Sequence, residues 1–289
     1  MAVAADRQRI GAAQSRRAAS WAPWCVLAVF TLGGVVLPQV LNRGPFDQNL
    51  AGRLLPPGAR GPDGAVYLFG TDPLGRDMLA RLAYGARLSL LVGVLSVLGA
   101  GLIGLAIGLV SGYAGGVMDR VLMRLVDLQL SFPFMIMAIG ILAVVTPSVV
   151  VVIALFVVAR WPAYARIVRG SVLEIKGREF VSAARALGAR GGRIVLRHVA
   201  PSCIGPLLVL ASFELAGVII AESSLGFLGV GIAPPTPTWG NMLAAGRNYV
   251  RTAWWLVMFP GLAICLVALS ANLIGDDLRD YFDPRLRKR

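Results

Sequence analysis

Residues 88–118 read LSLLVGVLSVLGAGLIGLAIGLVSGYAGGVM and contain no charged side chain. About 20 apolar residues in a helix are enough to cross the hydrocarbon core of a bilayer, and a longer helix can cross with tilt. Small residues at helix-contact spacing favour close packing between membrane helices, and here they are Gly93, Gly99, Gly101, Gly104 and Gly108. The stretch therefore predicts a membrane-spanning helix that packs closely against a neighbour.

The composition of the whole chain agrees with a membrane protein. Of its 289 residues, 57% are hydrophobic and 15% are charged, and the mean hydropathy is +0.72. A soluble domain carries roughly a quarter charged residues and about 45–50% apolar ones. Because a backbone inside a bilayer must satisfy its own hydrogen bonds, we expect the apolar runs to form helices.

Four further apolar runs predict five more spans. Charges are absent from 128–159, but one helix of that length would overshoot the bilayer, and Pro147 breaks the run in two. The third span is therefore expected to begin near Val121, and the fourth to continue to about Arg169. The other spans are expected at 21–41, 201–221 and 253–275. The predicted fold is all-α, a polytopic membrane protein with six transmembrane helices.

The basic residues indicate the orientation of the spans. Cytoplasmic loops of membrane proteins carry an excess of Lys and Arg, and most of the 28 Lys and Arg residues lie in the two tails, the turn after the second span and the segment 160–197. Six spans put both termini on one side, so both termini and the segment 170–200 are expected to be cytoplasmic. The net charge of +13 is then mainly a topology signal, and we expect headgroups of the lipid bilayer, and no nucleic acid, as its partner.

The expected organisation has four parts. A disordered cytoplasmic tail (1–20) precedes the first transmembrane helix and an exterior loop (21–87), then a transmembrane core (88–275), and finally a basic cytoplasmic tail (276–289). The apolar run after Arg16-Arg17 is long and has no convincing small-residue cleavage site. This favours a retained anchor helix over a removed secretory signal.

Three ionisable residues fall inside the predicted spans. Arg124 and Asp127 are three residues apart on one helical face and are expected to pair. Glu214 lies in the fifth span, where a carboxylate is costly and usually faces a cavity or a partner. Two interpretations of Glu214 stay open: it lines a pathway, or it forms a buried hydrogen bond to a neighbouring helix or a partner subunit.

The residues that catalytic and metal sites require are scarce. The chain has one histidine and three cysteines, Cys25, Cys203 and Cys265, with no CxxC spacing, which offers neither a disulfide framework nor a metal site. No GxSxG or Walker motif occurs. We therefore expect no catalytic residues, no metal, no cofactor and no ATPase activity in this chain.

A basic, glycine-containing stretch, SAARALGARGGRIVLRHVAP, occupies 182–201 between the fourth and fifth spans. Its pattern predicts a short helix over 180–187, an end at Gly188 where a left-handed residue is favoured, and a second helix from Ile194. Ala183, Ala184 and Leu187 are expected on one apolar face. That face suits either insertion into a groove of another protein or rest on lipid headgroups.

The same stretch resembles the cytoplasmic EAA loop of ABC importer permeases, in which Glu-Ala-Ala is followed after three residues by Gly and later by Leu-Pro. Ala183, Ala184, Gly188 and Pro201 match this pattern, whereas Ser182 replaces the usual Glu and Ala200 the usual Leu. Glu179, one turn earlier, can supply the acidic contact. The resemblance implies a coupling helix that contacts the ATPase through Glu179, Ser182, Ala183, Ala184, Leu187 and Gly188. His198 fits either a subfamily marker or a cap or packing residue.

Two other stretches indicate which group of ABC importer permeases the chain resembles. FGTDPLGRDMLARLAYGARLSLLVG (69–93) and AESSLGFLGVGIAPPTPTWGNMLAAGR (221–247) are similar to exterior segments of dipeptide, oligopeptide and nickel importer permeases. From the residues themselves we expect Thr71 or Asp72 to cap a helix that begins at Pro73. We also expect Trp239, Trp254 and Trp255 to lie at the membrane interface.

The resemblance implies a permease subunit of a peptide-type ABC importer in a bacterial cytoplasmic membrane. The implied partners are a homologous second permease, two ABC ATPase domains that bind ATP and Mg²⁺, and an extracytoplasmic substrate-binding protein. A secondary transporter and a non-conducting scaffold subunit are the alternatives. A secondary transporter usually shows internal repeats and interrupted helices, and no convincing repeat is seen in the sequence.

Overall fold

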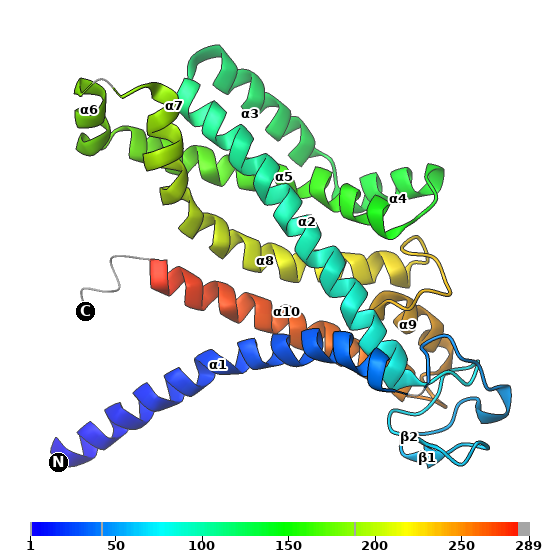
Figure 1. The fold of residues 1–289 in the computed structure, drawn as a ribbon. Helices are drawn as coiled ribbons and strands as arrows, with labels where there is room; N and C mark the ends of the chain where they lie inside the picture. The colour runs from blue at the N-terminus through cyan, green and yellow to red at the C-terminus, as the bar shows by residue number, and fades with distance from the viewer. Residues whose placement is uncertain (1, 42, 188, 283–289) are drawn as a thin grey trace. The chain divides into compact units, whose positions relative to one another are not determined.

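The computed structural model describes residues 2–41, 43–187 and 189–282, with side chains described from residue 21 onward except that of Arg185. Nearly all regular structure is helical (Figure 1). The longer helices are α1 (Ala2–Val40), α2 (Met78–Ala114), α3 (Gly116–Ser131), α4 (Phe134–Val144), α5 (Val149–Lys176), α8 (Ala200–Phe227) and α10 (Trp255–Phe282). Shorter ones are α6 (Glu179–Ala186), α7 (Gly191–Ile194), α9 (Trp239–Gly246) and the 3₁₀ turns Leu50–Gly52 and Arg247–Tyr249.

The strands form only one small hairpin. In the described residues β1 (Ala59–Arg60) pairs antiparallel with β2 (Val66–Tyr67), so that Ala59 lies opposite Tyr67. This hairpin belongs to the segment between α1 and α2, which was expected to be an exterior loop.

Five helices are long and apolar enough to cross a membrane, and a bent pair brings the number to six in the described residues. The bent pair is α3 with α4, at 82°. The expected third span is therefore not one straight helix. Pro133 explains the break, because its ring disfavours helical backbone at Phe132, which is extended at φ −87° and ψ 125°.

Two ends of the predicted helices also differ. Residues 2–20 are helical in the structure, where we expected a disordered tail, and their alanine, arginine and glutamine content favours a helix. The second span begins at Met78, before residue 88, because Asp77 caps α2: its Oδ1 accepts hydrogen bonds from Leu79 N–H (2.8 Å) and Ala80 N–H (3.2 Å). The expected cap at Thr71 or Asp72 and a helix start at Pro73 are wrong.

The chain forms two compact units. The first comprises Met1–Leu91 with Ile219–Asp277, and the second Val92–Val218 with Leu278–Arg289. α2, α8 and α10 each contribute residues to both units.

In the second unit, α2 packs closely against α5 through glycines. An added Cβ at Gly108 would lie 2.6 Å from the Val168 Cβ and 2.7 Å from the Ala165 carbonyl oxygen. Gly104 meets Tyr164, and Gly112 meets Val172, in the same way. The sequence expectation that these glycines serve close helix packing is thus supported, and the two backbones approach as only glycine allows. α2 then reverses into α3 through Gly115 and Gly116, at φ +67° and +58°.

In the first unit, tryptophans tie the segment before α2 to the later helices. Trp239 is fully buried, and its indole N–H donates to the Leu82 carbonyl at 3.1 Å. Trp255, also buried, donates to the Thr71 carbonyl at 3.1 Å. Of the three tryptophans expected at the membrane interface, Trp239 and Trp255 fill the core of this unit, whereas Trp254 is 50% exposed.

Candidate functional sites

The basic stretch after α5 folds as two helices in the second unit. α6 covers the helix expected over 180–187, and α7 continues through a π-helical segment, Val195–Val199, into α8. Figure 1 shows α6 and α7 near the same end of the unit as the turn from α2 into α3. The expected helix end at Gly188 lies outside the described residues.

One face of α6 is anchored in the core of the second unit. Val181 is fully buried with Ile194 and Val199, and these residues join a cluster that includes Val168 and Val172 of α5. Ala184 is partly buried against the same cluster. The expectation that Ala183, Ala184 and Leu187 share one face is therefore wrong. Ala184 faces inward, toward the α5 side chains, whereas Ala183 and Leu187 are exposed.

The opposite face of α6 is exposed. Ser182 and Ala183 are exposed, Glu179 lies at the start of the same helix, and Leu187 follows its end with 89% of its surface accessible. An apolar side chain as exposed as Leu187, beside small residues on a short anchored helix, is a suitable contact for a groove on another protein.

Contacts from neighbouring helices fix the position of this stretch. A Cβ at Gly191 would lie 3.1 Å from the Tyr113 hydroxyl oxygen, and Lys176 Nζ donates to the Tyr113 carbonyl at 2.7 Å. The ring of His198 lies 6.3 Å from that of Phe180, centroid to centroid. His198 thus contributes packing between α6 and the π-helical segment.

Three arginines of α5 each pair with a carboxylate from another helix. Arg160 Nη1 lies 3.4 Å from Glu214 of α8, Arg166 Nη2 lies 2.8 Å from Asp127 of α3, and Arg169 forms two hydrogen bonds with Asp119 of α3. The expected pairing of Asp127 with Arg124 is therefore wrong. The Arg166 guanidinium on α5 reaches the Asp127 carboxylate across the contact between α3 and α5.

Glu214 makes one of the two interactions considered from the sequence, a contact to a neighbouring helix. Its carboxylate and the Arg160 guanidinium are partly buried, with 14% and 28% of their side-chain surfaces exposed. Arg160 also lies over the Phe134 ring, 5.4 Å from its centroid. Two opposite charges and an aromatic ring therefore meet within the helices that span the membrane.

The segment between α1 and α2 holds a second polar network, in the first unit. Arg43 lies 3.6 Å from Asp63, 3.8 Å from Asp77 and 4.3 Å from the centroid of the Tyr67 ring. Burial raises the pKa of the Tyr67 hydroxyl, so this phenol stays protonated at neutral pH. In the part of the chain that is described, no three potential metal ligands gather into a metal site. The arrangement fits a structural network that holds the loop together.

The comparisons with known proteins agree with this architecture. Residues 104–288 match the family model described as binding-protein-dependent transport system inner membrane component. The chain belongs to this family. It is 40% identical over 250 residues to the di/tripeptide transport system permease protein DppC of Pseudomonas aeruginosa, covering 86% of this chain and 82% of the relative. It is 42% identical over 244 residues to the dipeptide permease protein DppC of Escherichia coli, covering 84% and 81%.

A solved structure supports the fold of this permease. The MetNI methionine ABC transporter in inward-facing conformations contains a chain that aligns with a TM-score of 0.57 at 22% identity, over 71% of this permease and 98% of that chain. The all-α fold with several membrane spans is therefore confirmed.

Several polar groups of the permease were not identified from the sequence. Glu222 of α8 is 2% exposed and accepts a hydrogen bond from the Ser89 hydroxyl at 3.1 Å within the first unit. Asp72 accepts from Arg76 Nε at 2.6 Å. Glu222 could have been noticed as the second acidic residue, after Glu214, in the stretch 201–227, but its partner Ser89 is too distant in the sequence to be inferred.

Asp119 joins three helices of the permease at the end that carries α6 and α7. It accepts hydrogen bonds from Arg169 Nε (2.6 Å) and Nη2 (2.7 Å) on α5, and one from the Ser111 hydroxyl on α2. Replacing Asp119 with asparagine should lower the free energy of unfolding by about 1–2 kcal/mol, because a bidentate charged pair loses one partner. The melting temperature of the detergent-purified protein measures this loss.

Asp127→Asn is the matched control for Asp119→Asn. The Asp127–Arg166 pair has a single hydrogen bond and is more exposed, with 60% and 56% of its side-chain surfaces accessible, so its loss should lower the free energy of unfolding less. Equal melting temperatures for the two variants would contradict the role given to Asp119.

Proposed function

We propose that this chain is one of two homologous permease subunits of an ATP-driven ABC importer that carries peptides. The observation that carries the proposal is the similarity of 36–42% over most of the chain to dipeptide and di/tripeptide permeases. The exposed face of α6 supports it, since a permease needs a docking surface for its ATPase. ATP and Mg²⁺ are bound by two partner ATPase domains, and an extracytoplasmic binding protein delivers the peptide.

The coupling helix in this proposal is α6. Its inward residues, Val181 and Ala184, hold it to α5 and the π-helical segment, and its outward residues, Ser182, Ala183 and Leu187, contact the ATPase. A push on α6 therefore reaches α5 through packed side chains. The chain needs no catalytic residue of its own for this task.

Transport by the reconstituted assembly tests the function. The permease is co-expressed with its homologous permease, the ATPases and the binding protein, and uptake of a radiolabelled dipeptide into proteoliposomes is measured. We expect uptake that requires both ATP and the binding protein. Uptake driven by a proton gradient without ATP would instead indicate a secondary transporter, and failure of the ATPases to co-purify would indicate a scaffold.

The proposal also fixes the topology of the chain in the bacterial inner membrane. A green fluorescent protein fused after Arg289 or inserted at Gly192 should fluoresce, because both positions are cytoplasmic, whereas alkaline phosphatase inserted at Gly61 should be active outside. The reason is the excess of arginine at the tails and around α6. Phosphatase activity at Gly192 would contradict the assignment of α6 as a cytoplasmic coupling helix.

A further inference from the structure

The Arg160–Glu214 pair joins the interior of two helices that are long and apolar enough to span a membrane. Arg160 is eleven residues from the start of α5, or about 17 Å at 1.5 Å per residue, and Glu214 is fourteen residues from the start of α8, or about 21 Å. A charged residue at the centre of a span is costly and rarely retained without a task. The pair therefore calls for an explanation beyond helix packing.

The Arg160–Glu214 ion pair has a long contact and incomplete hydrogen bonding. Its nitrogen and oxygen are 3.4 Å apart, and Arg160 Nε, Glu214 Oε2 and the Tyr164 hydroxyl have no hydrogen-bond partner among the described residues. Tyr164 is 1% exposed and lies one helical turn after Arg160 on α5. A buried polar atom left without a hydrogen bond is destabilising, because it has lost its contacts with water and gained none in return. The site thus offers a ligand hydrogen-bonding atoms on a cationic, an anionic and a neutral side chain.

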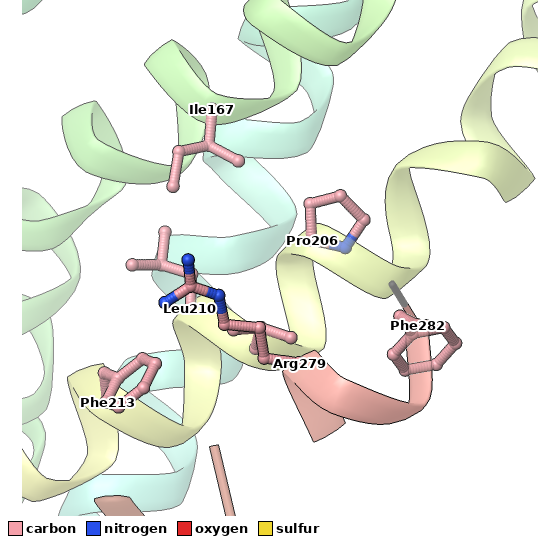
Figure 2. Close-up of a pocket in the computed structure, with 7 residues that line it drawn as sticks. Ile167, Pro206, Leu210, Phe213, Arg279 and Phe282 are labelled. Atoms are coloured by element: carbon pink, nitrogen blue, oxygen red, sulfur yellow. The ribbon is translucent and has the colours of Figure 1, made fainter. Parts of the chain in front are cut away.

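An apolar pocket continues along the same helices. It has a volume of about 440 Å³ and is lined by Ile167 of α5, by Pro206, Val209, Leu210 and Phe213 of α8, and by Arg279 and Phe282 of α10. Figure 2 shows Phe213, Leu210 and Pro206 following α8 along the pocket, with the Arg279 side chain reaching over it from α10.

The helical repeat places the pocket and the pair on one seam between α5 and α8. Ile167 is seven residues after Arg160, and Leu210 is four residues before Glu214, so each lies on the same face as the charged residue of its helix. The pocket is therefore the apolar continuation of the polar site, within one unit of the structure.

We propose that Arg160 and Glu214 open to bind the two charged ends of a zwitterionic peptide, with its apolar side chain in the adjoining pocket. Arg160 binds the carboxylate, and Glu214 with the Tyr164 hydroxyl binds the ammonium group. This inference rests on the proposed function and adds the substrate site within the membrane.

Charge balance within the Arg160–Glu214 pair favours a zwitterion, while Arg279, which lines the adjoining pocket, adds a cation outside the pair. The Arg160–Glu214 pair has no net charge, so a ligand with one positive and one negative end exchanges partners without leaving a charge unmatched. An anion or a cation alone would leave Glu214 or Arg160 buried without a counter-charge, which is strongly unfavourable. Arg is suited to the carboxylate because its guanidinium binds carboxylates through two parallel hydrogen bonds.

Cysteine accessibility tests the site in the complete importer. Cys25, Cys203 and Cys265 are first replaced by serine, and uptake by this background is verified. Leu210→Cys, in the pocket lining and one turn from Glu214, is then treated with a permanently charged methanethiosulfonate reagent, without the binding protein and with or without millimolar alanyl-phenylalanine. Leu208→Cys, on the other face of α8, is the matched control.

We expect rapid labelling of the Leu210→Cys variant, little labelling of the Leu208→Cys variant, and at least fivefold slower labelling of the former in the presence of alanyl-phenylalanine. N-acetyl-alanyl-phenylalanine amide, which has the same side chains but no charged ends, should not protect. No labelling at position 210 would mean that the pocket faces lipid or the second permease, and equal protection by the blocked peptide would mean that the charges of the free peptide are not recognised. Either result would overturn the proposal.

Transport kinetics provide an independent readout. At a saturating concentration of peptide-loaded binding protein, Glu214→Gln should lower the maximal rate of alanyl-phenylalanine uptake about tenfold, because the ammonium group loses its counter-charge, while Asp127→Asn should leave this rate unchanged. An unchanged rate in Glu214→Gln would overturn the site. Absence of any ATP-dependent peptide uptake by the wild-type assembly would contradict the proposed function alone, since protection at position 210 still decides whether a zwitterion binds.

Discussion

Replacing Leu187 with glutamate is expected to abolish ATP-dependent uptake, by at least tenfold, while the permease still folds and inserts. Leu187 is 89% exposed at the end of α6, so a charge there disturbs little within the chain. On the proposed function it enters an apolar groove of the ATPase, where a few buried contacts carry most of the binding free energy. The measurements are co-purification of the ATPase and peptide uptake by proteoliposomes.

Two controls separate docking from folding. Leu228→Glu changes another exposed leucine, 58% accessible, beyond the end of α8 on the expected exterior side, and should leave ATPase co-purification intact. Ala184→Glu places a charge against the core of the second unit and should reduce the yield of folded permease itself. Full uptake and co-purification by Leu187→Glu would mean that α6 does not contact the ATPase.

The second large effect is expected from a single methyl group at Gly108. In Gly108→Ala the new Cβ would lie 2.6 Å from the Val168 Cβ and 2.7 Å from the Ala165 carbonyl oxygen, so α2 and α5 would have to separate. Overpacking of this kind typically costs about 1–3 kcal/mol, and contact with backbone puts this case at the upper end. We expect a markedly lower melting temperature and less folded protein in size-exclusion chromatography.

Gly170→Ala on α5 is the matched control for Gly108→Ala. No heavy atom lies within 4 Å of a Cβ added at Gly170, so this substitution should be neutral or slightly stabilising, since alanine favours a helix by about 1 kcal/mol over glycine. Similar melting temperatures for both alanine variants would contradict the close contact of α2 and α5.

The membrane spans were predictable because hydropathy is a local property. A run such as 88–118 specifies a helix by its own composition, and the glycines within it indicate a close contact before the partner is known. The break at Phe132 was not predicted, although Pro133 follows it, because Pro147 already divides the charge-free run 128–159 into two pieces.

The partners of the charged residues were not predictable in this way. Arg124 is the nearest basic residue to Asp127 in sequence, but α5 packs against α3 in the second unit and brings Arg166 to within 2.8 Å. The side of α6 that faces inward could not be predicted from the sequence either. Ala183 and Ala184 are the same residue type, and only the position of the α5 valines distinguishes them.

The three ion pairs of α5 also have an order in time, since the chain is synthesised from its N-terminus. Asp119 and Asp127 on α3 are already made when Arg166 and Arg169 emerge from the ribosome, so these two arginines can enter the bilayer beside their counter-charges. Arg160 enters without its counter-charge, because Glu214 is synthesised only after α6 and α7. An arginine at mid-span costs about 2.5–3.5 kcal/mol during insertion. Stable integration of α5 is therefore completed late, when α8 arrives, and a nascent chain stalled before Glu214 should hold its fourth span less firmly than the finished protein.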